Sequence, residues 1–110
     1  MLEINKVNAK TWSRMGSRAT YGQAILALAE VDKEFLVLSA DLGSSSGLSR
    51  FETAFPERFL NVGIAEQNMI GIASGLAKEG FTVFASSFAP FISMRASEQI
   101  RMNLGYMDLN

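Results

Sequence analysis

The chain has 110 residues, 48% of them hydrophobic and 19% charged, which suits one small folded domain and excludes a disordered tail. Ten basic residues nearly balance eleven acidic ones, and no basic block is present to bind nucleic acid. The sequence has no cysteine and no histidine, which excludes disulfides, thiol nucleophiles and any histidine base from this chain.

Neither a membrane span nor a secretory signal is expected. The longest strongly apolar run, from Ala24 to Ala29, is far shorter than the roughly 20 residues that cross a bilayer. The first residues lack a basic segment that leads into an apolar stretch, which is the pattern of a secretory signal. We therefore expect a cytoplasmic protein with no membrane partner.

The first elements can be read from the spacing of apolar residues. Residues 1–16 have weak periodicity and are interpreted as an N-terminal arm or a loose helix, with Trp12 packed on a neighbour. The spacing predicts a helix over 17–31, ended by Asp32. The continuous apolar run 35–38 is typical of a strand buried on both faces.

A Gly/Ser loop, residues 41–47, follows this strand. Ser49 and Glu52 then match a capping box that begins a short helix, and this helix is expected to stop before Pro56. Residues 59–62 are predicted to form a second strand.

The second half continues the same alternation. A helix is predicted over 66–78, with Gly80 as its C-cap. Residues 81–85 form a third predicted strand, and a last helix covers 90–104 and ends at Gly105.

Strands and helices that alternate through short loops predict an α/β fold, a parallel sheet with helices on both faces. Three strands leave an edge of the sheet open where a further strand is due. We therefore expect residues 17–110 to be the first part of a domain that is incomplete at its C-terminus.

Ligands of open α/β sheets bind beyond the carboxyl ends of the strands, which here are followed by residues 41–47, 63–66 and 86–91. None of these segments contains a known phosphate-binding fingerprint. The serine-rich segment 44–47 is either a phosphate loop or a plain mobile loop, and its pattern favours the second.

Glu66 is the most suggestive single residue, because it begins a helix after a strand and has apolar neighbours. An acid there commonly stabilises the helix dipole, by roughly 0.3–1 kcal/mol. The functional alternative is a desolvated carboxyl that shares a proton with a ligand nitrogen.

Other candidates have equally simple structural explanations. Phe88 and Phe91 are either core residues or an aromatic wall that stacks on a flat heterocycle. Arg95, one turn after Phe91, is either a solvated charge or part of the same pocket. Gly71 and Gly75 permit close helix packing and indicate an interface between two helices.

The segment 62–77, VGIAEQNMIGIASGLA, resembles the pyrimidine-binding domain of the transketolase family of thiamine-diphosphate enzymes. The nearest pattern is the separate C-terminal section of two-gene transketolases. Residues 38–42, 55–59 and 84–88 match in the expected order, so the resemblance covers roughly residues 15–110.

The resemblance implies a role for each candidate. Glu66 matches the glutamate that hydrogen-bonds N1′ of the cofactor's aminopyrimidine, which favours the imino tautomer that deprotonates the thiazolium. Phe88 and Phe91 match the aromatic wall around this ring. Ile64 matches a residue that packs on the cofactor, and Asp41 matches an acid near the thiazolium.

Two positions depart from the transketolase pattern. Arg95 resembles an arginine of the deoxyxylulose-phosphate synthase pattern, in a register that differs by one residue, and is assigned to the cofactor site on that basis. Met94 takes a place where transketolase often has tyrosine, so the aromatic wall is thinner here.

The resemblance also implies partners. The family binds its cofactor between two domains, and the diphosphate and Mg²⁺ are held by a domain whose GDG…N signature is absent here, so we expect no metal ligand on this chain. We expect the chain to be inactive alone and to act with a diphosphate-domain subunit and a copy of itself, as an α₂β₂ heterotetramer.

The expected activity is transfer of a two-carbon ketol unit between sugar phosphates. The alternatives are the beta half of a 2-oxo acid dehydrogenase, a deoxyxylulose-phosphate synthase, and a catalytically silent interaction module.

Overall fold

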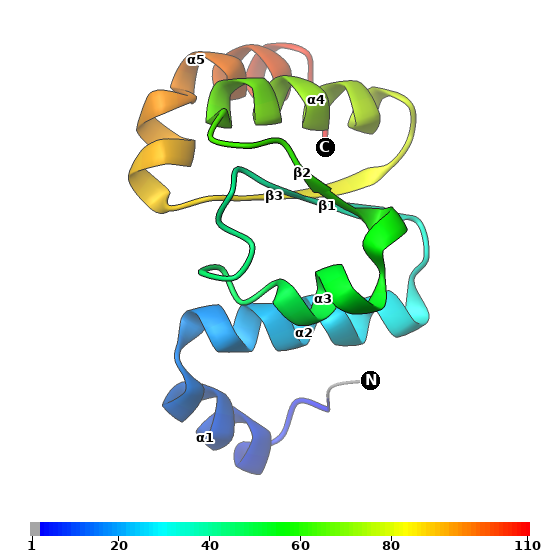
Figure 1. Cartoon of the computed structure of the whole chain (residues 1–110), viewed down its shortest axis with the longest axis vertical. Helices are drawn as coiled ribbons and strands as arrows, with labels where there is room; N and C mark the ends of the chain where they lie inside the picture. Colours follow the sequence, from blue (N-terminus) through cyan, green and yellow to red (C-terminus); the bar gives the residue numbers. More distant parts are fainter. Residues whose placement is uncertain (1–2) are drawn as a thin grey trace.

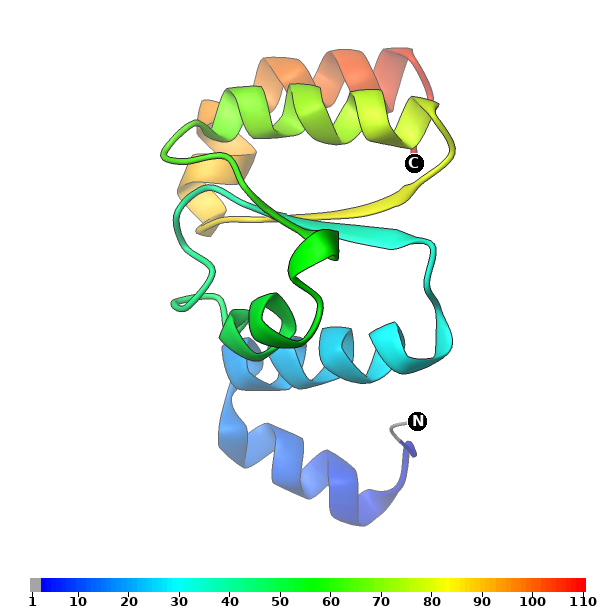
Figure 2. The ribbon, with the colours of Figure 1, turned by 45° about the vertical axis from the view of Figure 1, so that its right-hand side comes forward.

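The computed structural model describes residues 3–110. The strands are β1 (Phe35–Ser39), β2 (Phe59–Asn61) and β3 (Thr82–Ser86), and the main helices are α2 (Ser17–Val31), α3 (Ser49–Ala54) and α4 (Glu66–Lys78). The strands form a parallel sheet in the order β2-β1-β3. Helices α2 and α3 cover one face, and α4 and the C-terminal helix cover the other (Figures 1 and 2). The predicted α/β fold class is confirmed.

The central strand supplies the core on both faces, because successive side chains of a strand point in opposite directions. Phe35 and Val37 are buried in an apolar cluster with side chains of α2 and α3. Leu38 is buried in a second cluster with Met69 of α4. The continuous apolar run therefore serves both helical layers, as predicted.

The three strands end at the same level. The predicted starts of β1 and β2 are confirmed, whereas the start of β3 and the end of each strand differ from the prediction by one residue. Ser39 at the end of β1 pairs with Asn61 of β2 on one side and Ser86 of β3 on the other. The three loops that follow the strands therefore emerge from one edge of the sheet, as the site prediction requires.

The predicted capping box at α3 is wrong. Ser49 is already helical, and Leu48 occupies the N-cap without any side-chain capping hydrogen bond. Leu48 is buried, and its N–H donates to the Gly43 carbonyl at 2.8 Å. The backbone hydrogen bond from Leu48 to the preceding loop thus fixes the start of α3, and the helix begins without a polar side-chain cap.

The last helix is longer and less regular than predicted. It consists of a π-helical segment η2 (Pro90–Arg95), a short α5 (Ser97–Ile100) and a second π-helical segment η3 (Arg101–Tyr106). The helix therefore runs past the predicted end at Gly105. Apolar spacing over six residues cannot distinguish a wider turn from an α turn, so this irregularity was not predictable from the pattern.

The N-terminal arm is helical over most of its length. Helix α1 (Lys6–Met15) is capped by Asn5, whose side-chain oxygen accepts from the Asn8 N–H at 2.9 Å. Trp12 is half-buried, and its carbonyl accepts from the hydroxyl of Thr20 on α2. Residues 1 and 2 of the predicted arm lie outside the described residues, and the domain boundary at residue 16 stays a prediction.

The end of α4 follows the prediction. The N–H groups of Gly80 and Phe81 donate to the carbonyls of Ala77 and Leu76, which is the Schellman pattern, and Gly80 has a φ of +98°. Gly71 and Gly75 lie on the outer side of the same helix, where a Cβ would meet nothing within 4 Å among the described residues.

Arg58 is a buried cation that the sequence interpretation missed. It ends the short 3₁₀ turn η1 (Pro56–Arg58), is 9% exposed, and its guanidinium lies 4.4 Å from the Phe35 ring centroid. It donates to the carbonyls of Phe35, Ala29 and Asp32 at 3.1, 3.3 and 2.9 Å. One side chain therefore joins the C-terminal end of α2 to the first residue of β1.

Over residues 3–110, no helix has the length and apolar character needed to cross a bilayer.

Candidate functional site

The loops that follow β1 and β2 are joined by Asn61, which the sequence interpretation did not single out. Its side-chain oxygen accepts from the N–H groups of Asp41 and Gly63, both at 3.0 Å. Its amide nitrogen donates to the Asp41 carboxylate at 3.4 Å. Asp41 has a φ of +60°, and this conformation is held by the link to Asn61. The ends of β1 and β2 are thus fixed relative to each other.

Glu66 is buried at the start of α4. Its residue is 3% exposed, and its carboxylate oxygen accepts from Nη1 of Arg95 at 3.2 Å. The neighbouring N-cap, Ala65, has no side chain to cap the helix. A simple helix-dipole role does not require burial, because an exposed acid in a first turn already contributes about 0.3–1 kcal/mol. The burial of this carboxylate is therefore not explained by a helix-dipole role alone.

An aromatic pair continues from this ion pair. The rings of Phe88 and Phe91 are stacked with centroids 6.1 Å apart, and the Arg95 guanidinium lies 4.5 Å from the Phe91 centroid. Phe88 is 39% exposed and neither ring belongs to the two core clusters. The structure therefore places Phe88, Phe91, Arg95 and Glu66 in one continuous array, which favours the aromatic wall over the core interpretation.

Two predicted site residues stand apart from this array. Ile64 is 78% exposed in the turn between β2 and α4, and Asp41 is exposed in the loop after β1. Within the described part of the chain, neither forms a hydrogen bond or ion pair with Glu66 or Arg95. Met94 is 76% exposed, and because it is a methionine it adds no third ring to the aromatic wall.

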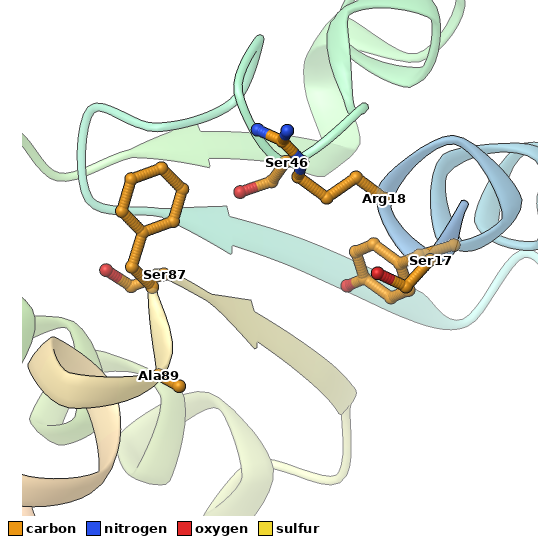
Figure 3. A pocket seen from close by; sticks show the side chains of 7 residues that line it. Ser17, Arg18, Ser46, Ser87 and Ala89 are labelled. Carbon is orange, nitrogen blue, oxygen red and sulfur yellow. The ribbon is translucent and has the colours of Figure 1, made fainter. Parts of the chain in front are cut away.

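A pocket of about 470 Å³ opens beside Phe88 at the same edge (Figure 3). The lining side chains come from the start of α2, the Gly/Ser loop and the segment after β3, and they are Ser17, Arg18, Tyr21, Ser46, Ser87, Phe88 and Ala89. Arg18 extends from α2 toward the Gly/Ser loop and donates to the Ser45 carbonyl at 3.3 Å. The sequence interpretation missed Ser17, Arg18 and Tyr21, because nothing in the helical pattern of α2 marks which residues meet a distant loop.

The Gly/Ser loop reaches this pocket through direct backbone contact with α2. A Cβ on Gly22 would overlap the Gly47 carbonyl, and a Cβ on Gly47 would lie 2.5 Å from the Arg18 carbonyl oxygen. Gly47 also has a φ of +80°. The two glycines therefore allow the close approach that buries Ser46 against the helix.

The lining of the pocket combines polar and aromatic side chains. The hydroxyls of Tyr21 and Ser86 are hydrogen-bonded at 2.6 Å, and burial raises the pKa of Tyr21, partly offset by this hydrogen bond. The Ser87 hydroxyl is buried without a hydrogen-bond partner among the described residues. Arg18 and the serine hydroxyls are donors that suit an anionic or hydroxylated ligand.

No cluster of three or more acidic side chains that could hold a metal ion is present in residues 3–110.

Fold and site together define a class of protein: an α/β domain with a parallel sheet that presents a buried carboxylate and stacked aromatic rings at its carboxyl edge. Residues 13–110 match the family model described as "Transketolase, pyrimidine binding domain". The chain belongs to the transketolase family through this domain, so the predicted family is confirmed.

Several curated relatives are similar over most of the chain. A Methanocaldococcus jannaschii protein, named as a transketolase C-terminal section, is 50% identical over 86% of this chain and 30% of its own length. A 6-deoxy-6-sulfo-D-fructose transketolase subunit of Clostridium sp. is 41% identical over 84% of this chain and 29% of its own. A 1-deoxy-D-xylulose-5-phosphate synthase of Desulforudis audaxviator is 37% identical over 84% of this chain and 14% of its own.

A solved structure described as "Split gene transketolase, inactive beta4 tetramer" has the same fold, with a TM-score of 0.74 and 49% sequence identity. The match covers 82% of this chain and 30% of the solved chain. The chain thus spans less than a third of the length of these relatives.

Proposed function

We propose that the chain acts as the cofactor-activating part of a split transketolase that transfers a two-carbon ketol unit between sugar phosphates. The observation that carries this proposal is the buried Glu66 carboxylate beside the Phe88–Phe91 pair, in a chain of the transketolase family. When bound, thiamine diphosphate supplies a thiazolium carbon that takes up the two-carbon unit.

The residues at the edge fit an aminopyrimidine ring. Glu66 is buried, so its carboxylate forms stronger hydrogen bonds than it would in water and shares a proton with N1′ of the ring. Phe88 and Phe91 present a flat aromatic surface to the ring face. Glu66 is thus the proposed catalytic residue, because its hydrogen bond to N1′ favours the imino form of the ring.

The remaining proposed residues of the cofactor site lie at its periphery. Ile64, exposed in the turn before α4, packs against the cofactor once a partner covers this edge. Asp41, fixed by Asn61, lies on the thiazolium side. Arg95 borders the ring site through its contacts with Glu66 and Phe91.

The proposed partner is a diphosphate-domain subunit that holds the diphosphate and Mg²⁺, with a second copy of this chain in the same cytoplasmic assembly. The name of the Methanocaldococcus jannaschii relative, a C-terminal section, supports a separate N-terminal subunit. The solved relative is described as an inactive tetramer of beta chains, which supports inactivity of this chain alone.

The pocket beside Phe88 is the proposed place for an anionic group of the sugar phosphate. Arg18 supplies a positive charge to the lining, and Ser46 and Ser87 supply hydroxyls. A guanidinium that is bonded to one carbonyl keeps further donors for phosphate oxygens.

The test is Glu66→Gln in the complex reconstituted with the diphosphate-domain subunit. We expect exchange of the thiazolium C2 proton for deuterium, followed by NMR, to slow by about a hundredfold or more, because the amide cannot hold the N1′ proton. The matched control, Glu98→Gln, removes an exposed carboxylate that pairs with Arg101 and leaves exchange unchanged. Normal exchange in the Glu66 variant, with its fold intact by circular dichroism, would contradict the proposed role.

A second candidate function is a deoxyxylulose-phosphate synthase, favoured by the 37% identity to the Desulforudis audaxviator enzyme. The reconstituted complex separates the two: a transketolase uses a ketose phosphate as donor, whereas the synthase and the 2-oxo acid dehydrogenases use a 2-oxo acid. A complex that binds no thiamine diphosphate at all would instead indicate a catalytically silent interaction module.

A further inference from the structure

Arg95 touches both of the groups that the proposed function assigns to the cofactor ring. Its Nη1 donates to the Glu66 carboxylate at 3.2 Å, and the same guanidinium lies 4.5 Å from the centroid of the Phe91 ring. A flat cation that donates to the carboxylate and stacks on an aromatic face makes the same two kinds of contact as a protonated aminopyrimidine. The Arg95 side chain thus makes the contacts with Glu66 and Phe91 that the proposed function assigns to the cofactor ring.

The backbone of Arg95 is fixed by its neighbours, whereas its side chain can leave the ion pair with Glu66. The Arg95 carbonyl accepts from the side-chain amide of Gln67 at 3.0 Å, and the next residue, Ala96, is fully buried. The Arg95 side chain is 50% exposed, whereas that of Glu66 is 4% exposed. The guanidinium can therefore swing into solvent by rotation about its own side-chain bonds, without movement of the helix.

If the cofactor ring replaces Arg95 at Glu66, both charged side chains have a partner before and after the replacement. A buried carboxylate without a partner is costly, so Glu66 needs a donor when no ring is present. Arg95 provides that donor, and the exposed guanidinium is hydrated when it leaves. Arg95 also sits at the end of the π-helical segment η2, a type of irregularity that is frequent at functional sites.

We infer that Arg95 is an internal occupant of the cofactor-ring site, which satisfies and shields Glu66 until the aminopyrimidine displaces it. The inference rests on the proposed function and deepens it, since it makes Arg95 a positioning residue that competes with the ring for Glu66. The cofactor binds only those molecules in which Arg95 has left Glu66. The apparent affinity for the cofactor therefore falls as the fraction of molecules with the Arg95–Glu66 ion pair rises.

The test compares Arg95→Met with wild type in the complex reconstituted with the diphosphate-domain subunit. Methionine keeps an apolar stem over Phe91 and removes the competing donor. We expect thiamine diphosphate with Mg²⁺ to bind about fivefold more tightly to the variant by calorimetry. Because salt weakens a half-exposed ion pair, the ratio of the two affinities falls toward one as ionic strength rises.

The matched control is Arg101→Met, which removes an arginine of the same helix whose exposed ion pair with Glu98 is outside the site. It leaves the affinity unchanged. In the chain alone, without cofactor, the Arg95 side-chain NMR signals of wild type show restricted rotation, and Glu66→Gln releases it.

The outcomes are distinct. Weaker cofactor binding by Arg95→Met would make Arg95 a direct ligand of the cofactor and would overturn the inference, and so would an unchanged affinity. Either result leaves the proposed function standing if Glu66→Gln still blocks C2-proton exchange. Failure of wild type to bind the cofactor would overturn the proposed function, and the inference with it.

Discussion

Two arginines of this chain lie over phenylalanine rings at opposite ends of the sheet and have opposite surroundings. Arg58 is 9% exposed and its guanidinium bonds to three backbone carbonyls at the beginning of β1. The Arg95 side chain is 50% exposed and bonds to one carboxylate beyond the carboxyl ends of the strands. The first arrangement joins elements of the fold and has no freedom to change. The second is open to solvent and is positioned to exchange partners.

The largest expected effect is at the buried arginine. Arg58→Met leaves the carbonyls of Ala29, Phe35 and Asp32 without their side-chain donor in a largely buried site. We expect a loss of about 2–3 kcal/mol in the free energy of unfolding, because hydrogen bonds from a charged group are worth about 1.5–3 kcal/mol. Denaturant unfolding followed by circular dichroism measures it. Arg50→Met, on the exposed side of α3, is the control and leaves the midpoint nearly unchanged. Equal losses of unfolding free energy in the two variants would contradict the role of Arg58 in joining α2 to β1.

A second large effect separates packed from open glycines. Gly22→Ala places a Cβ on the Gly47 carbonyl, so α2 and the Gly/Ser loop must move apart. We expect a loss of about 1–3 kcal/mol in unfolding free energy from overpacking. Gly75→Ala, where a Cβ meets nothing within 4 Å, is the control and raises helix stability by about 0.5–1 kcal/mol.

The same pair of variants tests the pocket. Because Gly22 sets the distance from α2 to Ser46, Gly22→Ala also widens the pocket beside Phe88 and weakens phosphate binding, which titration with inorganic phosphate detects. Gly75→Ala leaves phosphate binding unchanged. A tolerated alanine at residue 22 would contradict the close approach.

The sequence was sufficient for features set by local spacing. The β1 run, the helix over 66–78 and the Gly80 cap depend on neighbours a few residues away, and all three were confirmed. The three loops were correctly assigned to one edge, because parallel strands share a direction. The position of Glu66 at a helix start was also evident.

Contacts between distant residues were not predictable from one sequence. Arg58 meets Phe35 and Ala29 across 23 and 29 positions, and Tyr21 meets Ser86 across 65. The capping box failed for a related reason: the buried Leu48, held by the Gly43 carbonyl, decides how the chain enters α3. Tertiary packing prevailed over a local motif in that case.

The smallest expected effect concerns Tyr21, whose hydrogen bond to Ser86 links α2 to the end of β3. Burial raises its pKa above the ordinary value of 10.0, so the folded state holds the phenol proton more tightly than the unfolded state. The resulting stability is fully present below pH 10 and is lost as the pH rises through the folded pKa. Unfolding free energy measured from about pH 8 to pH 11 should therefore decline at the alkaline end.

Tyr21→Phe removes both this titration and the hydrogen bond to Ser86. We expect the variant to be less stable by about 1 kcal/mol near neutral pH, the net value of one hydrogen bond, and to show a smaller alkaline decline. The two curves therefore converge as the pH rises. A variant that remains parallel to wild type across this range would show that the phenol is solvated in the folded state, and the link between α2 and β3 would then be apolar contact alone.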